Sequence, residues 1–257
     1  MTPRAAIVTG AGSADGIGFA AARKLATGGA RVVITSTTDR IQQRVAELRA
    51  LGADAIGLSA DLTDPASSAR LVELACSSFG GIDILVNNAG MTSVAVPDEP
   101  ASISDLGDDQ WRASIARNLD TMFYLCRAVL PVMCAAGYGR IVNVASVSGP
   151  VVAFRGDAGY HAAKAAVIGL TRSIALDAAA DGVTANAVAP GWIGTASATE
   201  HERLMGQATP VGRCGTPDEV AGLIAYLAGP DAGYLTGQIL IVDGGNSIME
   251  ERAASRR

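Results

Sequence analysis

The sequence predicts a single α/β domain, with a doubly wound parallel sheet of about seven strands and helices on both of its faces. Short apolar runs alternate with helix-length segments along almost the whole chain, which is typical of parallel strands joined by right-handed helical crossovers. A length of 257 residues suits one undivided α/β domain, and no repeat or linker composition divides the chain. A glycine-rich loop, Gly10 to Gly18, follows the first apolar run, as it often does in such sheets.

Seven apolar runs are the expected strands. The first, Ala5-Ala6-Ile7-Val8-Thr9, has the composition of a strand buried on both faces. In chain order the strands are 5–9, 31–35, 55–60, 83–86, 140–145, 184–188 and 238–242. The helical patterns between them are 19–28, 39–51, 64–79, 108–136, 158–180 and 217–228. We expect the domain to span 1–246, with a Pro- and Ser-rich loop at 92–106, an irregular segment at 190–214 and a charged tail at 247–257.

Composition and charge restrict the class of protein. A hydrophobic content of 49% and a charged content of 18% fit a globular protein. A net charge of −5 does not favour binding to nucleic acid or to anionic membranes. The four cysteines show no C-x-x-C spacing and only two histidines are available, so we predict no metal site. Free thiols and an N-terminus without a signal-peptide pattern favour the cytoplasm. No apolar stretch of about 20 residues predicts a membrane span.

The loop from Gly10 to Gly18 lies between a predicted strand and a predicted helix. At such a place glycines let the backbone approach a phosphate, and the helix N-terminus offers free N–H groups. The literal G-x-G-x-x-G pattern fails, because a third glycine counted from Gly10 and Gly12 falls at Asp15. Taken alone, the loop fits a phosphate site and an ordinary glycine-rich turn equally well.

Tyr160 and Lys164 lie four residues apart in the predicted helix 158–180, and therefore on one face of it. A lysine cation beside a phenol favours the phenolate. A phenol with a pKa of about 10 needs a decrease of roughly 2–3 units to exchange protons near neutral pH. Taken alone, the pair is more simply a chance arrangement on a solvated helix face.

Six motifs occur in one order along the chain. They are Thr9-Gly10, Gly16-Ile17-Gly18, Asn87-Asn88-Ala89-Gly90, Ser146, Tyr160-x-x-x-Lys164 and Pro190-Gly191. In this order and spacing the chain resembles the short-chain dehydrogenase/reductase family over essentially residues 4–245, and within it the 3-oxoacyl-carrier-protein reductases. The resemblance implies a Rossmann-type fold, NAD(H) or NADP(H) as cofactor, interconversion of alcohols and ketones, and commonly a homotetramer.

The resemblance also implies catalytic roles for four residues. Tyr160 is the expected general acid/base toward the substrate oxygen, and Ser146 is expected to hydrogen-bond that oxygen. Lys164 is expected to lower the pKa of Tyr160 and to bond the nicotinamide ribose. Asn118 matches a helix asparagine that holds a water for proton relay, and an asparagine in mid-helix is otherwise a mild misfit.

The predicted cofactor contacts come from the same resemblance. They are Gly10, Gly12, Ser13, Gly16, Ile17, Gly18, Ser36, Thr37, Thr38, Arg40, Asp61, Leu62, Asn88, Ala89, Gly90, Tyr160, Lys164, Pro190, Gly191, Ile193 and Thr195. The family usually has three residues between its first two glycine positions, whereas five separate Gly10 from Gly16 here. The contacts of this lengthened loop therefore stay open.

The residues after the second strand bear on the choice of cofactor. An acidic residue at this place binds the ribose 2′-OH and repels a 2′-phosphate, but Ser36 stands there, followed by Thr37, Thr38 and Arg40. Hydroxyls and a guanidinium can hold a phosphate, whereas Asp15 in the glycine loop counts against one. On balance the sequence favours NADP(H) over NAD(H).

Several functions remain open at this stage. The leading one is a hydride-transferring oxidoreductase of a free small or medium-sized alcohol or ketone. Its pocket is expected at 93–100, 148–155, Trp192 and 195–212, with Ser148 as a rival of Ser146. The first alternative is a 3-oxoacyl-carrier-protein reductase, which is disfavoured because basic residues are scarce where helices 108–136 and 158–180 end. A non-catalytic cofactor-binding regulator and a dehydratase or epimerase are further alternatives. The same two helices are those expected to pair in a homotetramer.

Overall fold

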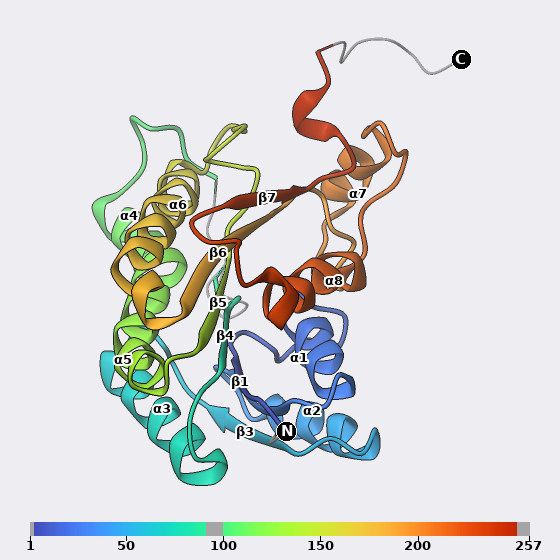
Figure 1. Cartoon of the computed structure of the whole chain (residues 1–257). Helices are drawn as coiled ribbons and strands as arrows, with labels where there is room; N and C mark the ends of the chain where they lie inside the picture. Colours follow the sequence, from blue (N-terminus) through green and yellow to red (C-terminus); the bar gives the residue numbers. More distant parts are fainter. Residues whose placement is uncertain (1–2, 91–99, 251–257) are drawn as a thin grey trace.

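The computed structural model describes residues 3–90 and 100–250. Its core is a parallel sheet with the strand order β3-β2-β1-β4-β5-β6-β7 (Figure 1). The strands are β1 (Ala5–Val8), β2 (Arg31–Ser36), β3 (Ala55–Ser59), β4 (Ile84–Asn87), β5 (Gly139–Val144), β6 (Val183–Pro190) and β7 (Ile239–Val242). This order reverses direction between β1 and β4, the point at which open α/β sheets bind ligands beyond the carboxyl ends of their strands.

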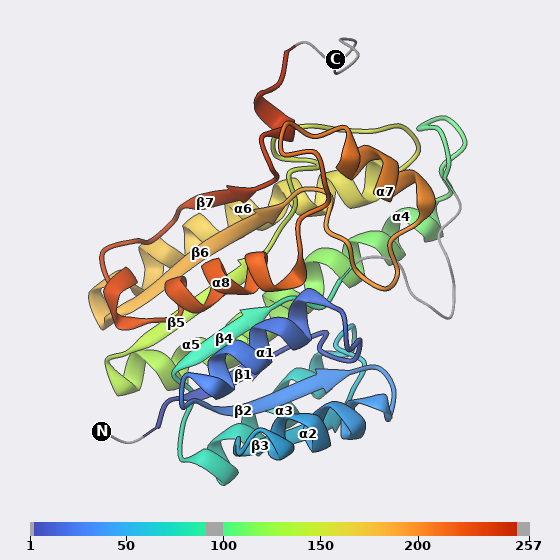
Figure 2. The same ribbon diagram turned by 90° about the vertical axis from the view of Figure 1, so that its right-hand side faces the viewer.

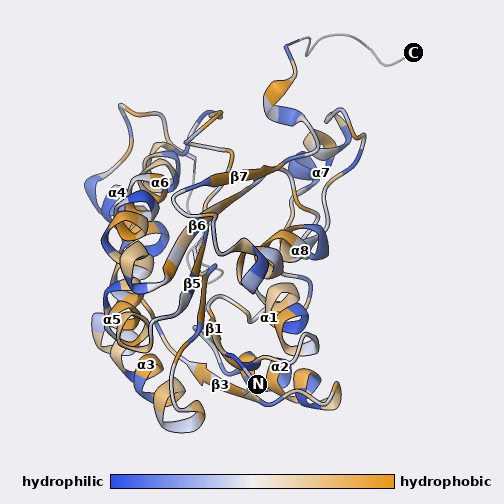
Figure 3. Cartoon of the chain, viewed as in Figure 1, coloured by the Kyte–Doolittle hydropathy of each residue, from blue (hydrophilic) through white to orange (hydrophobic). Residues whose placement is uncertain are grey.

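Helices cover both faces of the sheet (Figure 2). One layer holds α1 (Ile17–Thr27), α2 (Arg40–Ala50) and α8 (Pro217–Leu227); the other holds α3 (Pro65–Phe79), α5 (Thr121–Ala136) and α6 (Ala158–Ala178). Successive residues of a strand point to opposite faces, so Ala6 and Val8 of β1 enter the first core while Ala5 and Ile7 enter the second. In Figure 3 the strands are largely hydrophobic and the helices carry their polar residues outward. The Rossmann-type doubly wound fold is confirmed.

The predicted elements are present, with ends shifted by at most two residues, but two corrections concern the site. The expected helix 108–136 consists of α4 (Asp108–Ile115), a π-helical turn η1 (Ala116–Asp120) and α5. The segment 190–214 is not wholly irregular, because it contains α7 (Glu200–Gln207). A capping box, in which Thr199 and Glu202 bond each other's backbone N–H groups, begins that helix.

The continuous run Asp108–Ala136 is long and apolar enough to cross a membrane by length and composition alone. Leu125, Val129 and Met133 of this run are completely buried against the sheet. We therefore describe it as a partly buried core helix. Residues 93–99 of the expected pocket and residues 251–257 of the expected tail lie outside the described part of the chain.

Candidate active site

The glycine loop carries β1 into α1 at the carboxyl end of the sheet (Figure 1). Gly16 precedes α1 without a side-chain cap, and the first turn of the helix has no acidic residue. The first N–H groups of α1, those of Ile17 and Gly18 among them, are thus left for an anionic ligand. The lengthened part of the loop folds into a turn closed by a bond from Gly16 N to Ser13 O (3.2 Å), with Ala14 and Asp15 exposed. The loop therefore retains the features of a phosphate site.

Close packing explains the other glycines of the loop. A Cβ on Gly10, which has φ 66°, would lie 2.8 Å from Ala89 Cα, and one on Gly18 would lie 2.5 Å from Asn88 Nδ2. The Asn88 amide donates to the carbonyls of Thr9 and Gly10, both at 3.1 Å. Asn88 thus ties the end of β4 to the glycine loop, next to the predicted contacts Ala89 and Gly90.

The part of the site that is expected to hold the adenosine end of the cofactor lies at the carboxyl ends of β2 and β3. A Cβ on Gly12 would be 2.7 Å from both Arg40 Nε and Ser36 Cβ, so these two side chains lie directly over the loop. Ser36 Oγ donates to Thr38 O (2.8 Å). Thr37, Thr38 and Arg40 are exposed, as is Asp61, whereas Leu62 is buried in the core. The predicted contacts therefore surround the loop, except that Leu62 offers only its backbone.

The four predicted catalytic residues come from three elements and meet beyond β5. Asp157 caps α6 by accepting from Tyr160 N (3.3 Å), which places Tyr160 in the first turn of that helix. Ser146 follows β5, and its side chain hydrogen-bonds Tyr160. Lys164 Nζ lies 5.6 Å from the Tyr160 ring centroid. A Cβ on Gly90 would be 2.9 Å from Asn118 Oδ1 and 3.3 Å from Lys164 Nζ, so Asn118 reaches the same place from η1.

Burial decides the protonation of this group. It raises the pKa of Tyr160 to about 12, although the hydrogen bond from Ser146 lowers it and the charges of Asp157 and Glu202 raise it further. Burial also lowers the pKa of Lys164 to about 8. The expected decrease in the pKa of Tyr160 is not found in this structure. Burial of the phenol dominates, and Lys164 donates to Val144 O (3.0 Å) rather than to the phenol.

Ser148 is also buried, and its backbone supports Ser146, because the Ser148 N–H donates to Ser146 Oγ (3.0 Å). This bond holds the Ser146 hydroxyl oxygen in place. Behind it, a buried polar chain runs from Asn87 to Asn143 (2.9 Å) and from Asn143 to Thr171 of α6 (2.9 Å). The chain fixes α6 against β4 and β5, and sequence reasoning gave it no role.

The side of the site expected to receive substrate is aromatic. Phe154 packs edge-on against His161 at 4.5 Å between ring centroids, and its ring lies 6.4 Å from that of Trp192. His161 thus packs against Phe154, a residue that the sequence analysis did not single out. Trp192 also borders a small cavity of about 140 Å³ that Ile193 shares. Thr195 is half-buried nearby, with its hydroxyl 3.1 Å from that of Ser197.

The end of β6 closes the site. Val147 N donates to Pro190 O (3.0 Å), and Gly191 N donates to Val242 O (2.9 Å). A Cβ on Gly191 would lie 2.7 Å from Asp243 Cβ, so only glycine fits between β6 and β7 here.

A parallel sheet with an uncapped glycine loop at its switch point, and a tyrosine, lysine, serine and asparagine beyond β5, defines a nicotinamide-dependent oxidoreductase. The chain belongs to the short-chain dehydrogenase/reductase family, whose members act on CH–OH groups with NAD(P). A family model described as enoyl-(acyl carrier protein) reductase matches residues 10–247.

Individual relatives resemble the chain over nearly its full length. The 3-oxoacyl-[acyl-carrier-protein] reductase FabG of Escherichia coli (strain K12) is 39% identical over 245 residues, which cover 93% of this chain and 96% of that protein. Cyclohexanol dehydrogenase of Acinetobacter sp. (strain SE19) is 39% identical, with 94% of both chains covered. A mutant short-chain dehydrogenase/reductase of Serratia marcescens has a solved structure that superposes with a TM-score of 0.86 at 35% identity, covering 95% of this chain and 98% of that one.

Proposed function

We propose that the protein interconverts a free, small or medium-sized secondary alcohol and the corresponding ketone. The observation that carries the proposal is the meeting of Tyr160 with Ser146, Lys164 and Asn118 at one point of the sheet edge. A nicotinamide cofactor, when bound, supplies or accepts the hydride. Tyr160 is protonated at neutral pH, since both the ordinary pKa of a phenol, about 10, and its raised value of about 12 lie well above 7, so it can donate its proton to a carbonyl oxygen. Ser146 holds that oxygen by hydrogen bonding.

The presence of all four groups also argues against a non-catalytic regulator. A protein that only binds the cofactor has no need to keep all four of these groups, and Ser146 in particular is expected to contact the substrate and not the cofactor. A dehydratase or epimerase is disfavoured because, among the described residues, we assign no additional acid/base group to this pocket.

The carrier-bound substrate of the FabG relatives is the main alternative. An acidic carrier protein requires a basic docking surface, but neither α5 nor α6 has a basic residue in its last turn. Arg127 lies over the rings of Phe123 and Tyr124, at 5.0 and 5.5 Å. The aromatic pair Phe154 and Trp192 and the equal identity to cyclohexanol dehydrogenase favour a free, cyclic substrate.

Turnover measured with each substrate class tests this proposal. We expect a higher kcat/KM for free cyclic and aliphatic ketones than for a 3-oxoacyl carrier protein. A strong preference for the carrier-bound substrate that is lost at high salt would contradict the proposal, because it would reveal electrostatic docking.

We further propose NADP(H) as the preferred cofactor. Support comes from Arg40 and Ser36, which lie directly over Gly12 and bring no negative charge to the end of β2. We expect a lower Kd for NADPH than for NADH, and a loss of about tenfold in NADPH affinity in Arg40→Ala, equivalent to about 1.4 kcal/mol. NADH affinity should change little, and Arg70→Ala, on the exposed side of α3, is the control. Tighter binding of NADH by the unaltered protein would overturn the preference.

Assembly and location complete the proposal. A homotetramer in the cytoplasm is supported by the family resemblance and by exposed apolar side chains on α5 and α6. The catalytic domain comprises 1–246, including the substrate loop 190–214, and 247–257 is a charged tail.

A further inference from the structure

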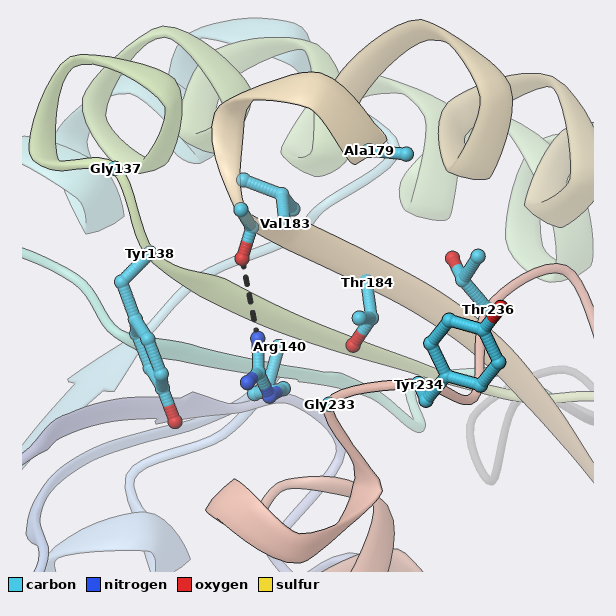
Figure 4. A pocket seen from close by; sticks show the side chains of 10 residues that line it. Gly137, Tyr138, Arg140, Ala179, Val183, Thr184, Gly233, Tyr234 and Thr236 are labelled. Carbon is cyan, nitrogen blue, oxygen red and sulfur yellow. Dashed lines mark hydrogen bonds between the residues drawn. The ribbon is translucent and has the colours of Figure 1, made fainter.

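A second cavity lies at the opposite ends of the strands from the site described above (Figure 4). The cavity has a volume of about 670 Å³, and its lining residues stand near the amino ends of β5 and β6. Ser146 and Pro190, by contrast, lie at the carboxyl ends of the same strands. The cavity lining includes Tyr138, Arg140, Gly182, Thr184, Gly233 and Tyr234. Known small-molecule sites have volumes of about 300–1,000 Å³, so this cavity has the size of a ligand site.

Arg140 places a buried positive charge on the cavity wall. The residue is only 6% exposed, and its bonds go to backbone carbonyls: Nε to Gly229 O (3.3 Å), and Nη1 to Gly139 O (2.8 Å) and Gly182 O (3.2 Å). No described carboxylate forms an ion pair with it, and no lining residue is acidic.

A guanidinium has five N–H donors, and the bonds above use only Nε and Nη1. Nη2 lies 3.4 Å from the position that a Cβ on the lining residue Gly233 would occupy. No hydrogen bond from Nη2 to a described residue is present, and Nη2 is not one of the fully enclosed unpaired atoms, so its donors are open to the cavity. A buried cation without a counter-ion is costly, and an anion in the cavity would remove that cost.

Thr184 supplies a second donor beside Arg140. The two residues are register partners on β5 and β6, so their side chains lie on the same face of the sheet. Thr184 is 6% exposed, and its buried Oγ1 has no hydrogen-bond partner among the described residues. Figure 4 shows both side chains directed toward the Gly233–Tyr234 segment.

The remaining wall is aromatic and close to a further cation. The Tyr138 ring centroid lies 4.3 Å from Arg140 Cζ and 3.7 Å from Arg4 Cζ, and Arg4 is paired with Asp83. Tyr234 stands at the rim with its side chain fully exposed.

We propose that this cavity binds a small phosphate ester, whose phosphoryl oxygens accept from Arg140 Nη2 and Thr184 Oγ1 while its organic group contacts Tyr138 and Tyr234. A tetrahedral phosphoryl group fits donors on two neighbouring strands, which lie about 4.8 Å apart, better than a planar carboxylate does. Asp181 and Asp231 belong to the turns η2 (Ala179–Asp181) and η3 (Pro230–Ala232) beside the cavity, but neither lines it.

Calorimetry on the full chain tests the proposal, with saturating nicotinamide cofactor present so that the glycine loop is occupied. Phenyl phosphate is the main probe, and inorganic phosphate and benzoate are the comparisons. We expect one equivalent of phenyl phosphate to bind, more tightly than either comparison. Arg140→Gln should weaken it at least tenfold, and Arg70→Gln, which removes an exposed charge on α3, should not.

Two milder variants guard against loss of folding in Arg140→Gln. Thr184→Val removes a buried, unpaired hydroxyl, so it should raise the Tm without ligand and still weaken phenyl phosphate about fivefold. Tyr234→Ala should weaken phenyl phosphate but leave inorganic phosphate unchanged. Undiminished binding in Thr184→Val and Tyr234→Ala, or binding of benzoate as tight as that of phenyl phosphate, would overturn the proposal.

Discussion

The pKa values of Tyr160 and Lys164 move in opposite directions, and both movements disfavour charge. Burial raises the first to about 12 and lowers the second to about 8. We therefore propose that Lys164 acts mainly by position, because its Nζ donates to Val144 O at the end of β5 and lies next to Gly90. In the reaction that we propose, proton donation by Tyr160 would depend on Ser146, whose hydrogen bond lowers the pKa of the phenol.

Removing the Tyr160 hydroxyl isolates its chemical role. We expect Tyr160→Phe to reduce kcat by about 10²–10⁴-fold, which is the usual contribution of a positioned acid or base. Cofactor affinity, measured by fluorescence titration, should change little because the ring remains. Tyr226→Phe, at an exposed position on α8, is the matched control. Near-normal kcat in Tyr160→Phe would refute the assignment.

The lowered pKa of Lys164 predicts a pH-dependent stability. Between the folded value of about 8 and the ordinary value of 10.5, the folded chain binds fewer protons at Lys164 than the unfolded chain does. Its contribution to stability must therefore rise with pH across this window. Tyr160 has the opposite sign, since its raised pKa makes stability fall above pH 10.

Denaturant unfolding at pH 7.5 and 9.5 checks this sign. From the lower to the higher pH, the unaltered protein should gain about 2 kcal/mol relative to Lys164→Met, since one pKa unit is worth about 1.4 kcal/mol. Lys24→Met removes the chain's other lysine, which is exposed, and should follow the unaltered protein. A gain that Lys164→Met shares in full would show that another group is responsible.

Among the secondary-structure elements, helices α7 and α8 begin with the same capping motif. Thr199 caps α7 and Thr216 caps α8, each in a capping box with a glutamate three residues later. Their surroundings differ: α8 buries Val220 and Ile224 against the core, whereas the described α7 buries only Gly206. The same substitution should therefore affect different properties in the two places.

Replacing each threonine by alanine removes about 1 kcal/mol of helix stability. In α8 the loss is global, and Thr216→Ala should lower the Tm by about 2–4 °C for a chain of this size. In α7 it is local, so Thr199→Ala should raise KM with little change in Tm, because Glu202 of α7 lies close enough to Tyr160 to influence its pKa. An equal decrease in Tm in both variants would contradict an independent α7.

The sequence could reveal the strands and most helices, because apolar runs and helical periods are local patterns. It could also have revealed α7, since Thr199-Glu200-His201-Glu202 has the spacing of a capping box. The π-helical turn at Asn118 has no such signal. It lies where α4 and η1 pack against α6, and the Asn118 amide there donates to Ser114 O (3.1 Å).

Ser146, Tyr160 and Lys164 could be selected from sequence because their motifs are ordered along the chain. The pKa of Tyr160 could not be predicted, because it depends on burial by segments far apart in sequence. Phe154 lacked any motif, and only the fold brings it against His161.

For the whole molecule, the surface of the layer α4–α5–α6 is more apolar than a solvated monomer needs. Leu176 of α6 is 84% exposed, Phe123 of α5 is 41% exposed and Trp111 of α4 is exposed as well. We propose that these side chains on neighbouring helices form a contact in the homotetramer. The alanines of α6 would allow a second copy of the helix layer to approach closely.

This surface predicts the oligomeric state and a variant that changes it. Light scattering at micromolar concentration should give four times the monomer mass of 26.0 kDa. Leu176→Glu should lower that mass, because a carboxylate would be buried without a partner in the contact. Leu51→Glu, 57% exposed beyond α2 on the other face of the sheet, should retain the full mass. A monomer mass for the unaltered protein would refute the tetramer. An unchanged mass in Leu176→Glu would place the contact elsewhere, since one charged side chain per copy in the centre of an apolar interface should prevent association.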